Sequence, residues 1–189
     1  MTKSEIILAI NDARKFQKYC LFDEAITCLS KIELPIKDKN LEYDILKLLS
    51  FNYRKLQEYS FALIYINQAI KCIQVGKGIV NRNSAMAVCL MNKGVIYDEQ
   101  KKYKEAIKIY ISAIELFKQD YKETGDGGKL INALINLGTA YYNNFQLAYA
   151  KGCFYDAISY FGDDKNNDRR YEYIIQMLEK IENEELKND

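Results

Sequence analysis

The sequence predicts an all-α protein, organised as a solenoid of about four antiparallel helix pairs followed by a C-terminal capping helix. Three observations support this prediction. A single proline, Pro35, leaves long stretches in which helices are not interrupted. Hydrophobic residues make up 49% of the 189 residues, which is enough for a continuous core. Small and large side chains also recur at fixed offsets in four places, as expected of stacked structural repeats.

The clearest copy of the pattern runs from Leu90 to Ala113. The residues that follow Gly94 at offsets of 3, 12, 16 and 19 are Tyr97, Ala106, Tyr110 and Ala113. Two antiparallel helices approach closely only where a residue has little or no side chain, and large side chains fill the space beside it. This stretch therefore predicts two helices joined by a tight turn.

The same offsets recur from three other anchor residues. They give Tyr141, Ala150, Phe154 and Ala157 from Gly138; Tyr53, Ala62, Ile66 and Ala69 from Ser50; and Phe16, Ala25, Leu29 and Ile32 from Ala13. The residues at offset 9, which close the turn, are Phe22, Tyr59, Tyr103 and Leu147. One helix pair cannot bury its own apolar face, so four copies in register predict a stack.

This pattern resembles the tetratricopeptide repeat, a helix–turn–helix unit of about 34 residues. The four anchors are separated by 37, 44 and 44 residues, which is longer than that unit. In this respect the chain resembles kinesin light chains and the bacterial receptors that sense short signalling peptides. The resemblance implies a right-handed superhelix.

In chain order, residues 1–162 are expected to hold the repeats, at about 3–35, 40–76, 83–122 and 127–161. The helices are expected at 3–19 and 22–33, 40–57 and 59–75, 83–101 and 103–121, and 127–144 and 147–161. Pro35 ends the first pair, and Asn83 or Ser84 is the expected N-cap of the fifth helix. The glycines Gly76, Gly78, Gly125, Gly127 and Gly128 suit helix ends that are followed by a reversal.

Residues 163–189 are expected to form a polar linker and a capping helix. The linker sequence is GDDKNNDRR, from Gly162 to Arg170. Apolar residues then follow at helical spacing, at Tyr171, Ile174, Ile175, Leu178 and Ile181. A helix with one apolar side is what an open-ended stack needs to cover its last layer.

Charge and targeting signals exclude several classes of protein. A net charge of +1 argues against nucleic-acid binding. The stretch between Glu58 and Asp98 contains four basic residues and no acidic one. These basic side chains either form a patch that faces an anion or only solvate helix ends and a loop, and the second interpretation is favoured. The N-terminal residues lack the features of a signal peptide. No apolar run approaches the roughly 18 residues that span a bilayer. We therefore expect a cytoplasmic protein with no membrane association.

The chemistry of the side chains does not support catalysis. The chain has no histidine, and none of its five cysteines forms a C-x-x-C pair, so neither a metal nor a cofactor is expected. The cysteines are interpreted as reduced thiols that act as small core residues. The TGDGGK stretch lacks the spacing of a phosphate loop and is interpreted as a loop between repeats. No catalytic residue is predicted, and an enzyme is disfavoured.

The resemblance places a binding surface on the first helix of each pair. The candidate residues are Lys47, Phe51 and Arg54 in the second repeat, Met91, Asn92 and Val95 in the third, and Asn132, Asn136 and Thr139 in the fourth. Asn92 and Asn136 each precede a glycine anchor by two residues. An amide can donate to and accept from the backbone of an extended peptide, as in relatives that hold such peptides. The alternative interpretation is that asparagine is simply common at this exposed position of the repeat and has no binding role.

Two further features of the groove follow from the same alignment. Lys47 and Arg54 make one end basic, whereas Asp98 and Glu99 make the other acidic, so a bound peptide is expected to present acids to the first end. Leu48 stands where the repeats that grip a C-terminal carboxylate would need an asparagine. Binding of chaperone tails is therefore rejected.

Two function classes remain. The first is a scaffold or adaptor that binds a peptide or helix of a partner protein. The second is the peptide-sensing module of a bacterial signalling regulator, implied by the long repeats and the paired asparagines. Against the second class, the chain begins in a helical repeat without a separate DNA-reading domain. The sequence neither predicts nor excludes a homodimer.

Overall fold

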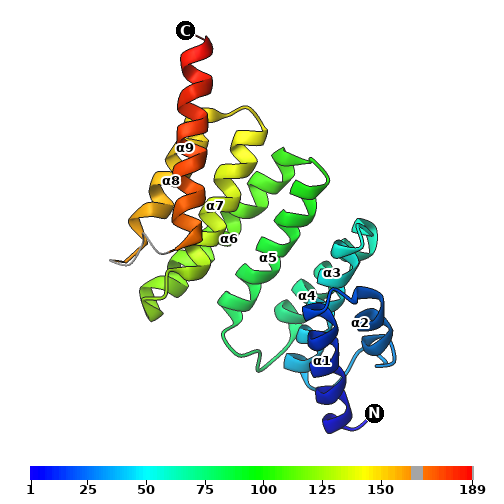
Figure 1. The fold of residues 1–189 in the computed structure, drawn as a ribbon. Coiled ribbons are helices and arrows are strands. Elements are labelled where there is room, and N and C mark those ends of the chain that lie inside the picture. The colour runs from blue at the N-terminus through cyan, green and yellow to red at the C-terminus, as the bar shows by residue number, and fades with distance from the viewer. Residues whose placement is uncertain (163–167, 189) are drawn as a thin grey trace. The chain divides into compact units, whose positions relative to one another are not determined.

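The structure is a computed structural model that describes residues 1–162 and 168–188, and the side chains of residues 187 and 188 are not described. Residues 163–167, which form part of the predicted polar linker, lie outside the described residues. Within the described part every regular element is an α-helix (Figure 1). The all-α class predicted from the sequence is confirmed.

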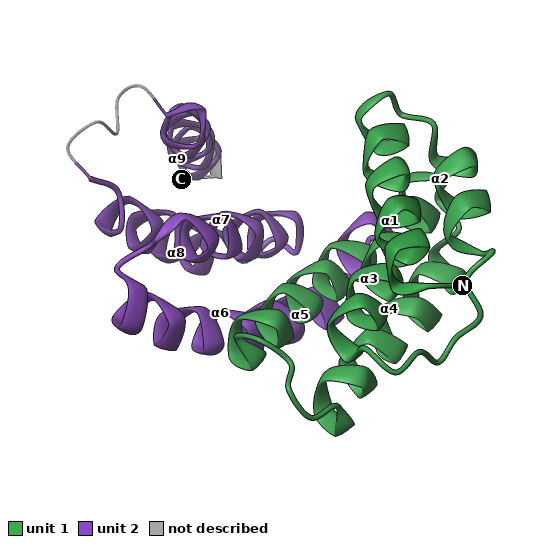
Figure 2. Ribbon diagram, turned by 90° about the horizontal axis from the view of Figure 1, so that it is seen from below, with its two compact units in different colours: residues 1–96 green, residues 97–189 purple. Residues whose placement is uncertain are grey.

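The chain divides into two compact units, residues 1–96 and 97–189, shown in green and purple in Figure 2. The first unit holds the helices α1 (Lys3–Lys18), α2 (Phe22–Leu29), α3 (Lys39–Lys55), α4 (Tyr59–Val75) and most of α5 (Arg82–Glu99). The second unit holds α6 (Tyr103–Thr124), α7 (Gly128–Asn143), α8 (Leu147–Ser159) and α9 (Arg169–Asn188). The division falls inside the third predicted repeat. This division reflects how compactly the chain packs and does not test where the repeats or domains begin and end, so their bounds remain predictions.

Most helix ends lie within two residues of the predicted ends. The second helix is an exception, because it ends at Leu29 and the chain turns before Ile32. The sixth helix runs three residues beyond the prediction, to Thr124, and ends at Gly125 with a φ of 72°. The predicted N-cap at Asn83 or Ser84 is wrong, because α5 already begins at Arg82.

The turn inside each predicted helix pair has one backbone geometry, repeated four times. Seven residues after each anchor the chain is left-handed, with φ between 59° and 61°, at Cys20, Gln57, Lys101 and Phe145. The next amide donates to the carbonyl five residues before it, over 2.9 Å, in the pairs Leu21–Phe16, Glu58–Tyr53, Lys102–Tyr97 and Gln146–Tyr141. The amide of the left-handed residue itself donates to the carbonyl three residues before it, and the two hydrogen bonds together make a Schellman motif. The four second helices then begin at offset 9, as the sequence predicts.

The anchor residues of the second and fourth pairs lie at close helix crossings. A methyl group built on Gly138 would lie 2.8 Å from a ring carbon of Phe154. The hydroxyl of Ser50 donates a hydrogen bond of 2.9 Å to the carbonyl of Ala62 on the opposite helix. Gly94 is buried in α5. The small residues of the pattern therefore let the two helices of a pair approach, as the sequence argument requires.

Two hydrophobic clusters hold the first unit together. One joins α1, α2 and α3 through residues that include Ala13, Ala25 and Leu29. The other joins α3, α4 and α5 through residues that include Leu46 and Cys89. Because α3 contributes to both clusters, two of its sides are buried in the core. The remaining side carries the predicted binding residues, and its orientation is set by the two buried sides.

The last helix covers the core of the second unit. Ile174, Leu178 and Ile181, all predicted for the apolar side of this helix, are buried. Lys151 Nζ of α8 also lies 2.9 Å from Glu185 Oε2 of α9. α9 thus packs against α8 through an apolar face and a polar edge, as expected of a capping helix.

Candidate functional site

The predicted residues of the second repeat share one side of α3. Lys47, Phe51 and Arg54 are half-buried. They lie at spacings of four and three residues, which places them one above another on a helix. The Arg54 guanidinium carbon lies 5.2 Å from the centroid of the Phe51 ring, within the range of a cation–π contact. This side of α3 therefore offers an aromatic surface with a cation beside it.

An acidic residue that the sequence argument missed lies on the same side of α3. The carboxylate of Asp44 bridges two bases, with Oδ1 3.1 Å from Lys47 Nζ and Oδ2 3.2 Å from Arg14 Nη2 on α1. The signal was present, because Asp44 precedes the Ser50 anchor by six residues, as Asn132 precedes Gly138. Part of the predicted basic character of this end is thus neutralised within the protein.

The predicted residues of the third repeat lie along α5. Met91, Asn92 and Val95 are half-buried, so each keeps an accessible part. The adjacent Lys93 points another way, and its Nζ donates a hydrogen bond of 2.8 Å to Asn67 Oδ1 on α4. The side-chain amide of Asn92 makes no hydrogen bond with any described residue. Its amide therefore keeps both a donor and an acceptor available.

In the second unit, α9 contacts two of the three predicted residues on α7. Asn132 Oδ1 accepts a hydrogen bond of 3.3 Å from Arg170 Nη1. The hydroxyls of Thr139 and Tyr173 lie 3.0 Å apart and share a hydrogen bond. Asn136, between them on the same helix, is half-buried, and its side-chain amide has no hydrogen-bond partner in the described part of the chain.

α9 also engages Tyr142, one turn beyond Thr139. The Tyr142 hydroxyl donates to Glu184, and Lys180 Nζ lies 4.7 Å from the centroid of the Tyr142 ring. These contacts join helices that are separated by a long stretch of chain. A ligand that used Asn132 or Thr139 would have to share them with α9, whereas Asn136 is available as it stands.

The predicted residues thus form two sets. Those on α3 and α5 belong to the first unit, and those on α7 belong to the second. Asn11, which the sequence argument missed, precedes the Ala13 anchor by two residues, as Asn92 precedes Gly94, and so belongs with the first set. It is exposed. Three of the four repeats therefore carry asparagine at this offset.

The predicted acidic end includes a carboxyl in an unfavourable environment. Burial raises the pKa of Asp98, and the nearby Glu99 carboxylate raises it further. Asp98 Oδ1 is buried and accepts no hydrogen bond within the described residues. A buried carboxylate without a donor is destabilised, so a base from a ligand would relieve this oxygen.

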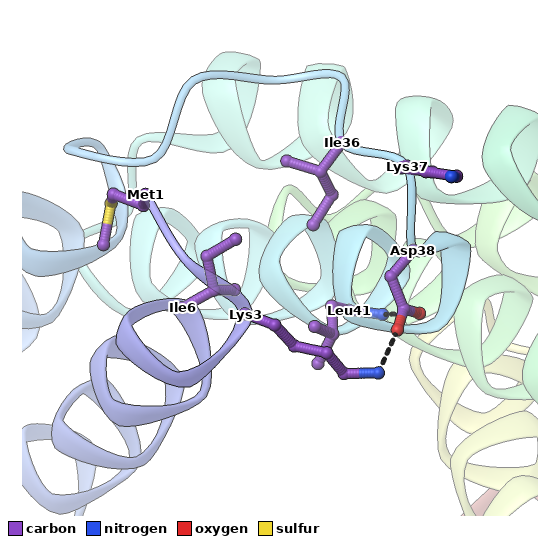
Figure 3. Close-up of a pocket in the computed structure, with 7 residues that line it drawn as sticks. All are labelled: Met1, Lys3, Ile6, Ile36, Lys37, Asp38 and Leu41. Atoms are coloured by element: carbon purple, nitrogen blue, oxygen red, sulfur yellow. Dashed lines mark hydrogen bonds and ion pairs between the residues drawn. The ribbon is translucent and has the colours of Figure 1, made fainter.

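A hollow in the first unit lies away from these residues. It has a volume of about 590 Å³ and opens beside the first turn of α1 (Figure 3). Its apolar walls are the side chains of Met1, Ile6, Ile36 and Leu41. Lys3 Nζ and Asp38 Oδ2 form an ion pair of 2.8 Å at its edge. No predicted binding residue lines it.

Cys89 and Cys153 are poorly suited to nucleophilic chemistry. Burial raises the pKa of both Cys89 and Cys153 to about 12, which disfavours the reactive thiolate. Within the described residues, His, Cys, Asp and Glu side chains do not gather in groups of three that could hold a metal ion. No described helix is both long and apolar enough to cross a membrane.

The repeated hairpins define the fold as that of tetratricopeptide-like repeats. The structure is similar to the apo form of RapI, with a TM-score of 0.81 and 15% identity, over 97% of this chain and 65% of that chain. A putative kinesin light chain of Podosopora anserina with nearly identical TPR-like repeats matches with a TM-score of 0.75 and 12% identity, over 96% of this chain and 87% of that one.

A third similar structure is the N-terminal domain of stress-induced protein-1 (STI-1) from C. elegans. It matches with a TM-score of 0.57 and 19% identity, over 78% of this chain and 99% of that domain. No protein-family model and no curated protein matches the chain. At these identities the likeness shows the fold alone, and the chain spans 65% of the length of RapI.

Proposed function

We propose that this chain is a non-enzymatic interaction scaffold or adaptor, which binds a peptide or helix of a partner protein along the first helices of its repeats. The tetratricopeptide-like fold supports the proposal, because stacked repeats leave an extended surface on one set of helices. The observation that carries it is the pair Asn92 and Asn136. Both stand at one repeat offset, both are half-buried, and neither side-chain amide has a hydrogen-bond partner among the described residues.

The residues around these amides have complementary roles in the proposal. Met91 and Val95 supply apolar contact on either side of Asn92. An amide that pairs with the backbone of an extended peptide tolerates many side chains, and the neighbouring residues then select among them. Asn132 and Thr139 would join the surface in the second unit if they exchanged their hydrogen bonds to α9 for bonds to the partner.

The basic end of the surface has a narrower role than its sequence suggests. Asp44 already pairs with Lys47, so an acidic partner residue would compete with this carboxylate. Phe51 and Arg54 offer a flat ring and a guanidinium group side by side, which suits a carboxylate next to an apolar residue. Asp98 would receive a base.

Affinity capture from extracts of the source organism, followed by mass spectrometry, tests the proposal. The bait is the full chain, compared with its Asn92→Ala, Asn136→Ala double variant. Asn83→Ala is the matched control, because Asn83 is exposed on α5 and lies nine residues from Asn92, on the opposite side of the helix. Partners that the wild type and the control retain should be lost by the double variant. Equal recovery by all three baits would refute the proposed surface.

The second candidate is the peptide-sensing module of a bacterial signalling regulator. The same unengaged amides support it, since they fit a short free peptide as well as a segment of a protein. The two candidates differ in the size of the ligand. A sensor should bind a short synthetic peptide as tightly as the parent protein, whereas an adaptor should need the longer partner segment. Calorimetry with both ligands distinguishes them.

The proposal also carries over three expectations from the sequence. It requires no cofactor or metal, it involves neither nucleic acid nor membrane, and it places the protein in the cytoplasm. A fluorescent fusion in the source organism tests the last expectation. Retention in the soluble cytoplasmic fraction is the expected result.

A further inference from the structure

A cleft of about 480 Å³ opens in the first unit between α2 and the turn that joins α3 to α4. Its lining comes from α2, the C-terminal end of α3 and the start of α4, and none of the predicted binding residues is part of it. The cleft is therefore separate from the surface proposed above. An inference about it does not depend on that proposal.

One wall of the cleft is a stack of aromatic rings. The rings of Tyr53 and Phe61 lie 5.1 Å apart at an interplanar angle of 27°, and Tyr53 also stacks on Tyr65 at 5.4 Å and 8°. Phe61, at the open end of the stack, is 48% exposed. Ile64, one turn further along α4, is 49% exposed. The stack thus ends in an accessible ring face with an apolar neighbour.

Two carboxylates line the same cleft as this ring. Asp23 lies in the first turn of α2, and Glu58 is the residue before α4, and both line the cleft. Both side chains are exposed, and neither forms an ion pair with any described residue. The remaining lining includes Ile26 and Leu56 but no lysine or arginine. The cleft therefore combines an aromatic face with uncompensated negative charge.

We propose that this cleft binds an arginine side chain of a partner protein. A guanidinium group is planar, stacks on aromatic faces and pairs with carboxylates through two parallel hydrogen bonds. Here Phe61 provides the face, and Asp23 and Glu58 provide the carboxylates. Ile26 and Leu56 contact the apolar stem of the arginine, and Ile64 contacts an apolar residue beside it in the partner sequence.

The fourth repeat provides an internal comparison. Tyr141 and Tyr149 stand at the same offsets as Tyr53 and Phe61, and they also stack, at 5.3 Å and 24°. The position of Glu58 is taken there by Gln146, and that of Asp23 by Lys104. Stacking alone is thus a property of the hairpin. The carboxylates are what distinguish the cleft of the first unit.

Nitrogen-15 NMR of the full chain, titrated with N-acetylarginine methylamide, tests the proposal. Saturable shifts are expected for amides in residues 22–28 and 53–62. The same titration should leave residues 141–149 unshifted, because that stack lacks the carboxylates. The neutral isostere N-acetylcitrulline methylamide should bind at least about fivefold more weakly, since it loses the charge-assisted bonds.

Surface variants make the test independent of folding. Asp23→Asn combined with Glu58→Gln should weaken binding of the arginine probe by about fivefold or more, and Phe61→Ala should do the same. Glu105→Gln, an exposed carboxylate on α6, is the control and should change nothing. Each variant is checked for unchanged dispersion of its amide spectrum.

Three results would overturn the proposal. The arginine probe could give no saturable shifts, or it could shift residues 141–149 equally. The citrulline probe could bind as well as the arginine probe. Finally, a chain that sediments as a dimer, with the cleft amides already protected and unresponsive to arginine, would assign the cleft to a second copy.

Discussion

Replacing Gly138 by alanine would place a methyl group against the ring of Phe154. The new carbon would lie 2.8, 3.0 and 3.1 Å from three ring atoms; the first distance is shorter than real Cβ contacts, and the other two are tighter than most of them. Phe154 is fully buried, so its ring has little room to move. Overpacking of this kind costs about 1–3 kcal/mol. Alanine also gains about 1 kcal/mol over glycine in helix propensity.

Because all three contacts fall on one buried ring, the overpacking cost should lie in the upper half of its range. The expected net loss for Gly138→Ala is then about 1–2 kcal/mol, after the propensity gain is subtracted. In a protein of this size, each kcal/mol lowers the melting temperature by roughly 2–4 °C. Urea unfolding followed by circular dichroism would measure the loss.

Gly152→Ala is the matched control. Gly152 is also inside a helix, α8, but an added methyl group there would have no heavy atom within 4 Å. This variant should therefore be stabilised by about 0.5–1 kcal/mol, from helix propensity alone. The double variant Gly138→Ala, Phe154→Leu should lose less than the sum of the single losses. If Gly138→Ala were as stable as Gly152→Ala, the close crossing inferred at Gly138 would be refuted.

Three further predictions follow from the turns, the last helix and the thiols. Lys101→Gly and Phe145→Gly should each raise the unfolding free energy by about 0.5–1 kcal/mol in urea titrations, because glycine removes the left-handed strain at φ values of 60° and 59°; a loss in both would contradict this. The neighbouring Arg170 guanidinium holds the pKa of Asp168 at about 2, so the ionised Asp168 stabilises the fold above about pH 4, and this contribution is lost as the pH falls toward 2. Thermal melts should therefore show that the melting temperature of Asp168→Asn falls less between pH 4 and pH 2 than that of the wild type. With iodoacetamide at pH 8, mass spectrometry should find exposed Cys20 modified first and Cys89, whose pKa is about 12, modified only after unfolding.

The hairpin geometry could be predicted from the sequence because its causes are local. A small residue at the anchor, an alanine at offset 12 and a large residue at offset 16 are set by how closely two helices pack. The structure buries Ala62, Ala106 and Ala150 completely at offset 12. Each second helix also begins at the residue that the pattern marked as closing the turn.

The left-handed residues of the turns could not be predicted in this way. Glycine is the usual sign of that conformation, yet a cysteine, a glutamine, a lysine and a phenylalanine occupy it here. The two hydrogen bonds of each Schellman turn outweigh the local cost of about 1–2 kcal/mol per residue. The residue types of these turns therefore do not indicate the left-handed conformation, although all four left-handed residues lie at the same offset from their anchors.

The candidate site was predicted less completely than the fold. The offsets placed Asn92 and Asn136 on half-buried positions, but they did not reveal that α9 bonds to Asn132 and Thr139. Those contacts join residues more than 30 positions apart, and no local pattern records them. Asp44 and Asn11 are different, because their offsets of six and two residues before the anchors Ser50 and Ala13 match those of Asn132 and Asn136 and are visible in the sequence.

Binding along the first helices is tested most directly by amide hydrogen exchange. The full chain is compared alone and with the binding segment of a captured partner. Slower exchange within residues 88–98 and 132–142 is the expected result. Unchanged exchange in both segments, with protection only on α2, α4, α6 or α8, would contradict a partner surface on the first helices.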